Sequence, residues 1–327
     1  MGIRTLSVFA IILCLSFSLP AAAVERNIEK SFDVKSGGTL DLNSDMGTVE
    51  IKSHAQDTVQ VTVDLIAHTS NDDRAKDIFD NFDLSFNSNN KDVTITGELP
   101  RKWFWNNYHL SVHFNITVPE RYNLKVKTGG GHINVSDIKG QADLKTSGGS
   151  IHLGNIDGEL DARTSGGSIH VLDVSGNTYV KTSGGSIKVG NVKGNLEART
   201  SGGPIDVDGV EGNLTAHTSG GGLHLMNVSG NLIGDTSGGP IIAELTKQVD
   251  GPVELRTSGG GIKLTVPADF KADLDASTSG GRVYSDIPVT VHGHLSNTSI
   301  NGKINGGGPE LRLRSSGGGI RIEQSTH

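Results

Sequence analysis

Apolar and polar residues alternate along most of this chain, and the alternation recurs at a fixed step. The segment Thr146-Ser-Gly-Gly-Ser-Ile-His-Leu153 has copies that begin every 18 residues from Thr128 to Thr236 and every 21 residues from there to Thr278. Counted from the threonine, positions 6, 8, 11, 15 and 17 are mostly apolar, and a usually polar residue separates 6 from 8 and 15 from 17. Because a spacing of two places side chains on one face of a strand, each unit predicts short strands with one buried face.

Glycine punctuates these predicted strands. Positions 3 and 4 are Gly-Gly in the repeats, and position 13 is glycine in every 18-residue unit from Gly140 to Gly230. Glycine adopts positive φ without steric cost, so both sites predict tight corners of the chain. Position 10, with Asp137, Asn155 and Asn191 among its residues, predicts a third corner.

A single unit cannot bury its apolar face, whereas stacked units can, since each strand then pairs with the same strand of the next coil. The sequence therefore predicts an all-β protein, a single-stranded parallel β-helix (β-solenoid) with coils of 18–21 residues and irregular caps at both ends. Eight coils from Thr128 to Ser277, at about 4.8 Å per coil, predict a rod about 38 Å long. The spacing of the aliphatic positions favours a right-handed over a left-handed coil.

The chain begins with the features of an export signal. Arg4 supplies a positive start, an apolar run follows, and Ala21-Ala22-Ala23 is a small-residue cleavage motif, so the mature chain is expected to begin at Val24. Export predicts a periplasmic, cell-surface or extracellular protein, and the mature part shows no transmembrane segment. The predicted divisions are a signal peptide at 1–23, irregular N-terminal β coils and cap at 24–127, regular repeats at 128–277, and C-terminal coils and cap at 278–327, with Leu311–Ile322 among the last coils.

The N-terminal part lacks the regular period. One helix is predicted over roughly Asp72 to Asn81, with Asn71 as its cap and Ala75, Ile78 and Phe79 on its buried side. The predicted strands are Thr39–Leu42, Thr48–Lys52, Val59–Ile66, Asp83–Phe86, Asp92–Thr96, Leu110–Val118 and Asn123–Lys127.

One segment between two of these strands is a candidate contact loop: Arg101, Lys102, Trp103, Phe104 and Trp105. Aromatic rings flanked by cations could dock on a sugar, a lipid headgroup region or another protein. The structural alternative, that the rings fold back and plug the N-terminal end of the rod, is the favoured interpretation.

Charge and cysteine content narrow the function classes. The formal charge is −7, and loss of Arg4 with the signal takes it to −8, which argues against nucleic acid as a partner. The single cysteine, Cys14, lies in the signal, so the mature chain has no disulfide.

Two outward-facing sets of side chains have candidate chemistry. His152, His170 and His224 occupy position 7, and the first two could share a metal ion, although solvated histidines are the favoured interpretation. Positions 16 and 18 are largely acidic and basic, respectively. They predict a self-neutralising solvated face, with a polyanion-binding stripe as the alternative. The sequence contains no catalytic motif, and we predict no catalytic, cofactor-binding or metal-binding residues.

Several segments together resemble the bacterial putative-adhesin family. They are Ser36-Gly-Gly-Thr-Leu-Asp-Leu42, Gly47-Thr-Val-Glu-Ile51, the Thr-Ser-Gly-Gly-x-Ile array and the ending from Gly306 to Ile322. The resemblance implies an exported β-solenoid and supplies no catalytic residues. We therefore expect a non-enzymatic, adhesin-like binding or structural module of the cell envelope, with glycans or envelope and surface proteins as partners. The alternative is a β-helical carbohydrate-active enzyme, a polysaccharide lyase or hydrolase.

Overall fold

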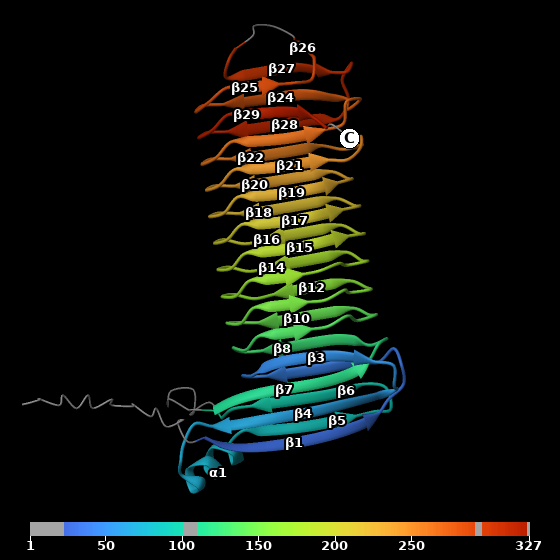
Figure 1. The fold of residues 1–327 in the computed structure, drawn as a ribbon, viewed down its shortest axis with the longest axis vertical. Helices are drawn as coiled ribbons and strands as arrows, with labels where there is room; N and C mark the ends of the chain where they lie inside the picture. Colours follow the sequence, from blue (N-terminus) through green and yellow to red (C-terminus); the bar gives the residue numbers. More distant parts are fainter. Residues whose placement is uncertain (1–22, 101–109, 292–295, 326–327) are drawn as a thin grey trace, which may run out of the picture.

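Two long sheets face each other along a rod in the computed structural model, which describes residues 23–100, 110–291 and 296–325 (Figure 1). In spatial order, sheet A contains β1 (Val24–Asp33), β4 (Thr58–Ala67), β7 (Leu110–Pro119), β3 (Thr48–His54), β9 (Ile133–Val135), β11 (Ile151–Leu153), β13 (Ile169–Val171), β15 (Ile187–Val192), β17 (Ile205–Val210), β19 (Leu223–Val228), β21 (Ile241–Leu245), β23 (Ile262–Val266), β29 (Ile320–Gln324) and β25 (Val283–Ser285). Sheet B contains β26 (Val289–Val291), β27 (Ser299–Ile304), β24 (Ala272–Thr278), β28 (Glu310–Ser315), β22 (Val253–Thr257), β20 (Leu232–Thr236), β18 (Leu214–Thr218), β16 (Leu196–Arg199), β14 (Thr178–Lys181), β12 (Leu160–Arg163), β10 (Ala142–Thr146), β8 (Asn123–Thr128), β2 (Thr39–Ser44), β6 (Val93–Glu98) and β5 (Asp83–Ser88). The predicted parallel β-solenoid is confirmed.

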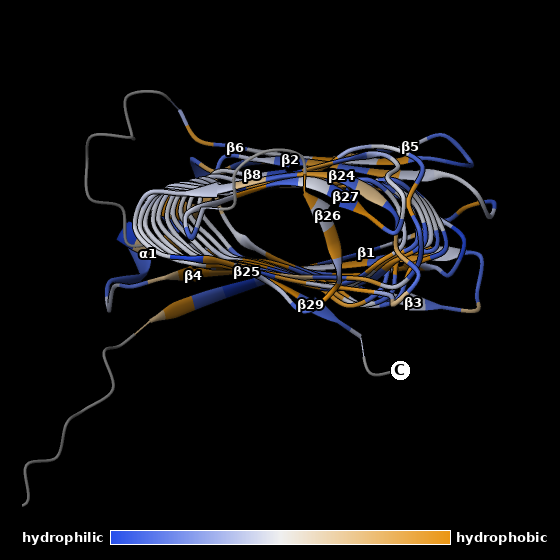
Figure 2. Cartoon of the chain, turned by 90° about the horizontal axis from the view of Figure 1, so that it is seen from above, coloured by the Kyte–Doolittle hydropathy of each residue, from blue (hydrophilic) through white to orange (hydrophobic). Residues whose placement is uncertain are grey.

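The core lies between the two sheets, as the view along the rod shows (Figure 2). Each regular coil gives positions 6 and 8 to sheet A and positions 15 and 17 to sheet B, and equivalent residues pair in parallel register, as Ile151 does with Ile169. Position 11 closes the edge between the sheets, where Ile138, Ile156 and Val174 form successive bridges. These apolar side chains are buried, so the alternation in the sequence produces stacked aliphatic columns.

The Thr-Ser-Gly-Gly motif joins consecutive coils through a buried hydroxyl. Thr164 Oγ1 donates to the carbonyl oxygen of Gly149, one coil earlier, at 2.7 Å, and the equivalent bond recurs along the array. The threonine of each copy is buried, from Thr128 to Thr278. The hydroxyl satisfies a turn carbonyl that would otherwise be buried without a partner.

The glycines of the repeats serve a different purpose from the one predicted. From Thr128 to Ser279, none of the motif glycines has positive φ. A Cβ at Gly149 would instead lie 2.1 Å from the carbonyl oxygen of Gly131, and one at Gly158 would lie 2.3 Å from that of Gly140. The corners lie where they were predicted, but the reason for glycine is different: the turns stack so closely that a Cβ at Gly149 or Gly158 would hit the preceding coil.

The N-terminal end confirms the predicted helix and adds a strand that was not predicted. Helix α1 (Asp72–Asp80) is capped by the side chain of Asn71 and buries Ala75, Ile78 and Phe79. Strand β1 pairs antiparallel with β4, which pairs antiparallel with β7. The coil β2–β3 lies out of sequence order, because β2 pairs with both β6 and β8 and β3 with both β7 and β9.

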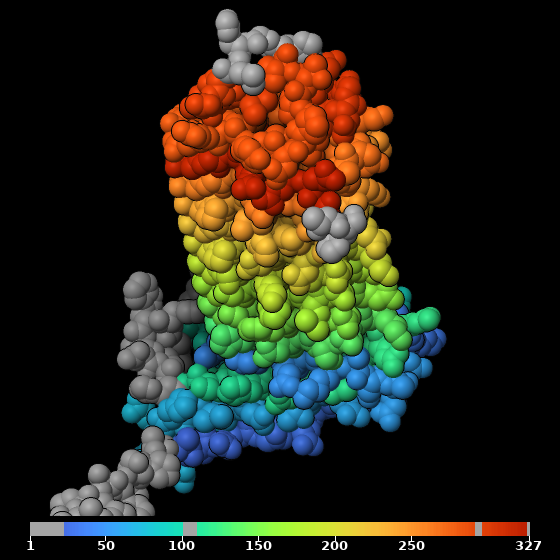
Figure 3. Space-filling view, turned by 45° about the horizontal axis from the view of Figure 1, so that its top comes forward, coloured from blue at the N-terminus to red at the C-terminus, as the bar shows by residue number. Residues whose placement is uncertain are grey.

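The C-terminal end has a second displaced coil. Strand β28 lies between β22 and β24, and β29 lies between β23 and β25. Figure 3 shows this red layer with orange layers on either side. The prediction that Leu311–Ile322 forms a last coil beyond residue 278 was therefore wrong, as was uninterrupted stacking up to Ser277. The stack ends instead with β27, antiparallel to β24, and β26, antiparallel to β27.

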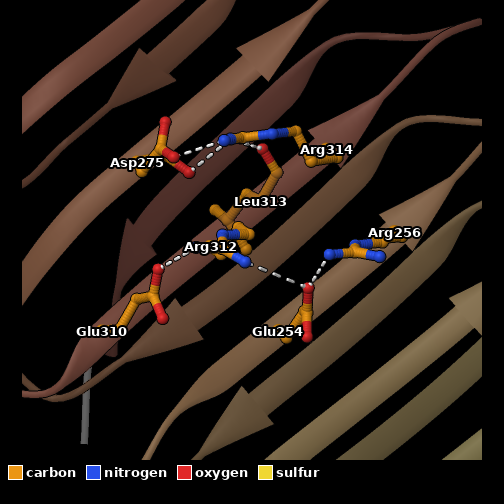
Figure 4. Close-up of polar contacts among 7 residues, drawn as sticks. All are labelled: Glu254, Arg256, Asp275, Glu310, Arg312, Leu313 and Arg314. Atoms are coloured by element: carbon orange, nitrogen blue, oxygen red, sulfur yellow. Dashed lines mark hydrogen bonds and ion pairs between the residues drawn. The ribbon is translucent and has the colours of Figure 1, made fainter.

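Ion pairs between coils are found where coils are displaced. Arg312 reaches Glu254 of β22 at 3.9 Å and also pairs with Glu310 of its own strand, while Arg314 pairs with Asp275 of β24 (Figure 4). Arg314 Nη1 also donates to the carbonyl oxygen of Asp275 at 2.8 Å. These contacts fasten the inserted coil to both of its neighbours.

Candidate functional site

An open groove of about 640 Å³ runs along the outer face of sheet B, across strands β8 to β18. Its sides are formed by positions 14 and 16 of successive coils, and the backbone of the buried position 15 lies between them. Since consecutive strands in a sheet lie about 4.8 Å apart, each column presents its side chains at that interval along the rod.

Position 14 forms an amide ladder, made up mainly of Asn177, Asn195 and Asn213. The backbone N–H of Asn195 donates to Asn177 Oδ1 at 3.1 Å, and that of Asn213 donates to Asn195 Oδ1 at 2.9 Å. These bonds occupy the amide oxygens. Within the described residues, the Nδ2 groups of Asn177 and Asn213 have no acceptor, so this wall offers hydrogen-bond donors to the groove.

Position 16 forms the opposite wall and carries carboxylates paired along their own strands. Asp161 accepts from Arg163 Nε at 2.7 Å, Glu197 pairs with Arg199 Nε at 2.7 Å, and Asp143 pairs with Lys145 at 3.4 Å. This confirms the self-neutralising face predicted from positions 16 and 18. The hydrogen bond that Arg163 donates to Asp161 raises the pKa of the Arg163 guanidinium above its ordinary value.

Two residues break this pattern near the middle of the groove. Tyr179 replaces the acid of position 16, and the Arg163 guanidinium carbon lies 4.7 Å from its ring centroid. Glu159 replaces the amide of position 14, and within the described part of the chain its side chain has no hydrogen bond or ion pair. The groove therefore combines an aromatic ring, an unpaired carboxylate and a row of amide donors.

The histidines of position 7 lie on sheet A, away from this groove. His152 and His170 pair in register with ring centroids 6.2 Å apart and line a hollow of about 260 Å³. Burial, followed by the neighbouring His170 and His132, holds the pKa of His152 below its ordinary value. Among the described residues, no three His, Cys, Asp or Glu side chains gather as a metal site would require.

The predicted contact loop, Arg101 to Trp105, lies outside the described residues. The groove on sheet B was not predicted as a site, although its signal is present in the sequence. Tyr179 interrupts the acids Asp143, Asp161 and Glu197 at position 16, and Glu159 interrupts the amides of position 14.

The fold defines this protein as a two-sheet parallel β-solenoid with a polar groove along one face. The chain belongs to the Toastrack DUF4097 family, whose sequence model matches residues 38–323. No curated protein matches the chain.

Three solved structures are similar to the chain. A putative cell adhesion protein from Clostridium sporogenes shares 14% identity over 92% of this chain and 100% of that chain, with a TM-score of 0.18. A putative adhesin from Parabacteroides distasonis shares 11% identity over 92% of this chain and 97% of that chain, with a TM-score of 0.30. A putative lipid binding protein from Parabacteroides distasonis shares 13% identity over 92% of this chain and 97% of that chain, with a TM-score of 0.24.

Proposed function

We propose that this protein is a non-enzymatic binding module of the cell envelope that holds an extended, polyhydroxylated chain, a glycan, in the sheet B groove. The observation that carries the proposal is the pairing of the two walls. Amide donors at position 14 face carboxylate acceptors at position 16, and both recur along the rod at the coil spacing.

Hydroxyl groups suit such a groove because each one both donates and accepts hydrogen bonds. A glycan laid along the rod could donate to the carboxylate wall and accept from the amide wall. The interval of about 4.8 Å between coils is close to the length of one pyranose ring, so successive sugars would meet equivalent groups. Tyr179 adds an apolar ring surface on which a sugar face can pack.

The arrangement favours binding over turnover. Three of the four carboxylates in the groove are held in ion pairs with a basic residue of their own strand. Glu159 is exposed, and the carboxylates opposite it, Asp143 and Asp161, are two of those held in ion pairs. Glycoside hydrolysis generally needs two carboxyl groups that flank one bond.

The envelope location rests on the export signal read in residues 1–23. In the part of the chain that the structure describes, no helix has the length and apolar character needed to span a membrane. An envelope module would display the groove to glycans on either side of the cell surface.

The test is a glycan array probed with the purified protein, with release of reducing ends and of unsaturated products assayed in parallel. Tyr179→Thr introduces the residue that stands at position 16 two coils later, Thr215, and should weaken binding roughly fivefold to tenfold. The matched control on sheet A is His170→Asn. It introduces the residue that stands at position 7 two coils earlier, Asn134, and should leave binding unchanged.

Saturable binding without product release, weakened in Tyr179→Thr and unchanged in His170→Asn, would support the proposal. Product release would favour the alternative, a β-helical carbohydrate-active enzyme. Binding to no glycan, or equal loss in both variants, would refute the groove as the site.

A further inference from the structure

A row of basic residues runs beside the groove at position 18. Lys127, Lys145, Arg163, Lys181 and Arg199 pair in register on consecutive strands of sheet B, from β8 to β16. Their side chains therefore stand at intervals of about 4.8 Å along the rod. Like charges in such a column repel one another, and paired carboxylates, solvent or a ligand that supplies negative charge can offset the repulsion.

Three of the five residues are neutralised within their own strands, whereas Lys127, which follows Lys125, has no ion pair among the described residues, as is also true of Lys181. Lys145, Arg163 and Arg199 each pair with the acid two residues earlier. The residue two before Lys181 is Tyr179, which carries no charge. Among the described residues, Lys181 accordingly makes no ion pair or side-chain hydrogen bond, and its side chain is exposed. In this coil, position 16 carries the aromatic ring of Tyr179 in place of a carboxylate.

The surface around this lysine carries a small net positive charge, although the chain as a whole is negative. Positions 14, 16 and 18 of the coils from β2 to β16 carry six basic residues and five carboxylates, on a chain whose formal charge is −7. The basic residues are Lys125, Lys127, Lys145, Arg163, Lys181 and Arg199, and the carboxylates are Asp41, Asp143, Glu159, Asp161 and Glu197. Lys125 is already paired with Asp41 at 2.8 Å.

The unpaired carboxylate of the groove lies apart from this row. Glu159 is at position 14, four residues along the strand from position 18, which corresponds to roughly 13 Å. A negative group placed at Lys181 would therefore stay clear of Glu159. The residues that pair with Lys181 on the two adjacent strands are Arg163 and Arg199, each of which already holds an acid of its own strand.

We propose that the groove selects a glycan whose sugars bear carboxylates, a uronic-acid type of chain, and that Lys181 is its specificity-determining residue. The ligand's carboxylate takes the place beside Lys181 that Asp161 takes beside Arg163 and Glu197 takes beside Arg199. The sugar ring that bears it packs on Tyr179. This inference rests on the proposed function, because it names the ligand class of the same groove.

The experiment is titration calorimetry of the full chain with paired hexasaccharides. The pairs are β-1,4-glucan with its C6-oxidised uronate form and β-1,4-mannan with β-1,4-mannuronan, at low and at high salt. The wild-type protein should bind the uronate member of a pair roughly fivefold more tightly at low salt, and the preference should shrink at high salt. Lys181→Gln should reduce the preference about two- to fivefold, as expected for an exposed ion pair, without changing the affinity for the neutral member.

Two variants control the result. Lys188→Gln removes a lysine on sheet A of the adjacent coil that is exposed and has no ion pair with any described residue, and it should leave the preference intact. Lys181→Arg keeps the charge and should retain the preference. Equal wild-type affinity for both members would overturn this inference while the glycan groove stands. A uronate preference unchanged in Lys181→Gln would overturn the assignment of Lys181. Binding of neither member would remove the inference together with the proposed function.

Discussion

Adjacent glycines in one turn should differ sharply in their tolerance of alanine. Gly166 and Gly167 both belong to the motif that begins at Thr164, and neither has positive φ, so backbone strain does not separate them. A Cβ at Gly167 would lie 2.2 Å from the carbonyl oxygen of Gly149 and 2.4 Å from its carbon. A Cβ at Gly166 would find its nearest neighbour, the oxygen of Gly148, at 3.1 Å.

The cost at Gly167 follows from what the new methyl group would hit. Both atoms belong to the backbone of the preceding coil, so the two coils must separate by about an ångström. Overpacking of this kind costs about 1–3 kcal/mol. The same movement strains the 2.7 Å bond from Thr164 Oγ1 to the oxygen of Gly149, worth about 1 kcal/mol. We expect Gly167→Ala to lower the free energy of unfolding by about 2–4 kcal/mol.

Gly166→Ala should be close to neutral. Alanine restricts the unfolded chain and gains about 0.4–1 kcal/mol where the native backbone accepts it. The contact at 3.1 Å offsets part of that gain. The expected difference between the two variants is therefore about 3 kcal/mol.

Urea unfolding followed by far-ultraviolet circular dichroism measures both changes. Hydrogen exchange locates them, because in a stack with nearest-neighbour contacts the loss should be greatest in β11 to β14. Equal destabilisation by the two substitutions would refute the explanation of the motif by close stacking, and so would a greater loss in Gly166→Ala.

Three further substitutions test other parts of the structure. Thr164→Val should lower the free energy of unfolding in urea by about 1–2 kcal/mol, because it leaves the buried Gly149 carbonyl without its donor. Thr164→Ser keeps the hydroxyl and should retain most of that stability. Burial raises the pKa of Tyr122 to about 12, so the folded state keeps a proton that the unfolded state loses from about pH 10. Stability should therefore fall by about 1–2 kcal/mol as pH rises from 10 towards 12, and Tyr122→Phe should lack this part of the slope when unfolding is measured across that range. Arg314→Gln should cost only about 0.5–1 kcal/mol overall, since its pair with Asp275 is partly exposed, yet hydrogen exchange should quicken in β24 and stay unchanged in β12 to β16.

The regular stack and the helix could be predicted from the sequence because local patterns determine them. The alternation at positions 6 and 8, seen in Ile151 and Leu153, fixes which side chains are buried. Asn71 before an amphipathic segment fixes the start of α1. Neither prediction depends on knowing which segments become neighbours in space.

The order of the coils could not be predicted, because it depends on which segments become neighbours in space. Leu311 and Leu313 carry the same alternation as Val253 and Leu255, so the pattern fits them equally well beside several strands. Side chains outside the core columns, such as Arg314 with Asp275, also join the strands that become neighbours, and such pairs are visible only once the strands are adjacent. The groove could not be predicted either, since Glu159 and Tyr179 belong to different coils and line one surface only when the coils stack.

The displaced C-terminal coil reduces fraying at the end of the solenoid. In a stack held by nearest-neighbour contacts, a terminal coil has one interface and frays, and a free chain end makes fraying easier. Here the coil β28–β29, which contains the last described strand, has an interface on each side. The outer coil, β24–β25, is instead a mid-chain segment tethered at both ends and covered in sheet B by the antiparallel β27. To fray, that outer coil must open as a closed loop, which releases less conformational freedom than a free end would, and so the inserted coil protects the end of the stack.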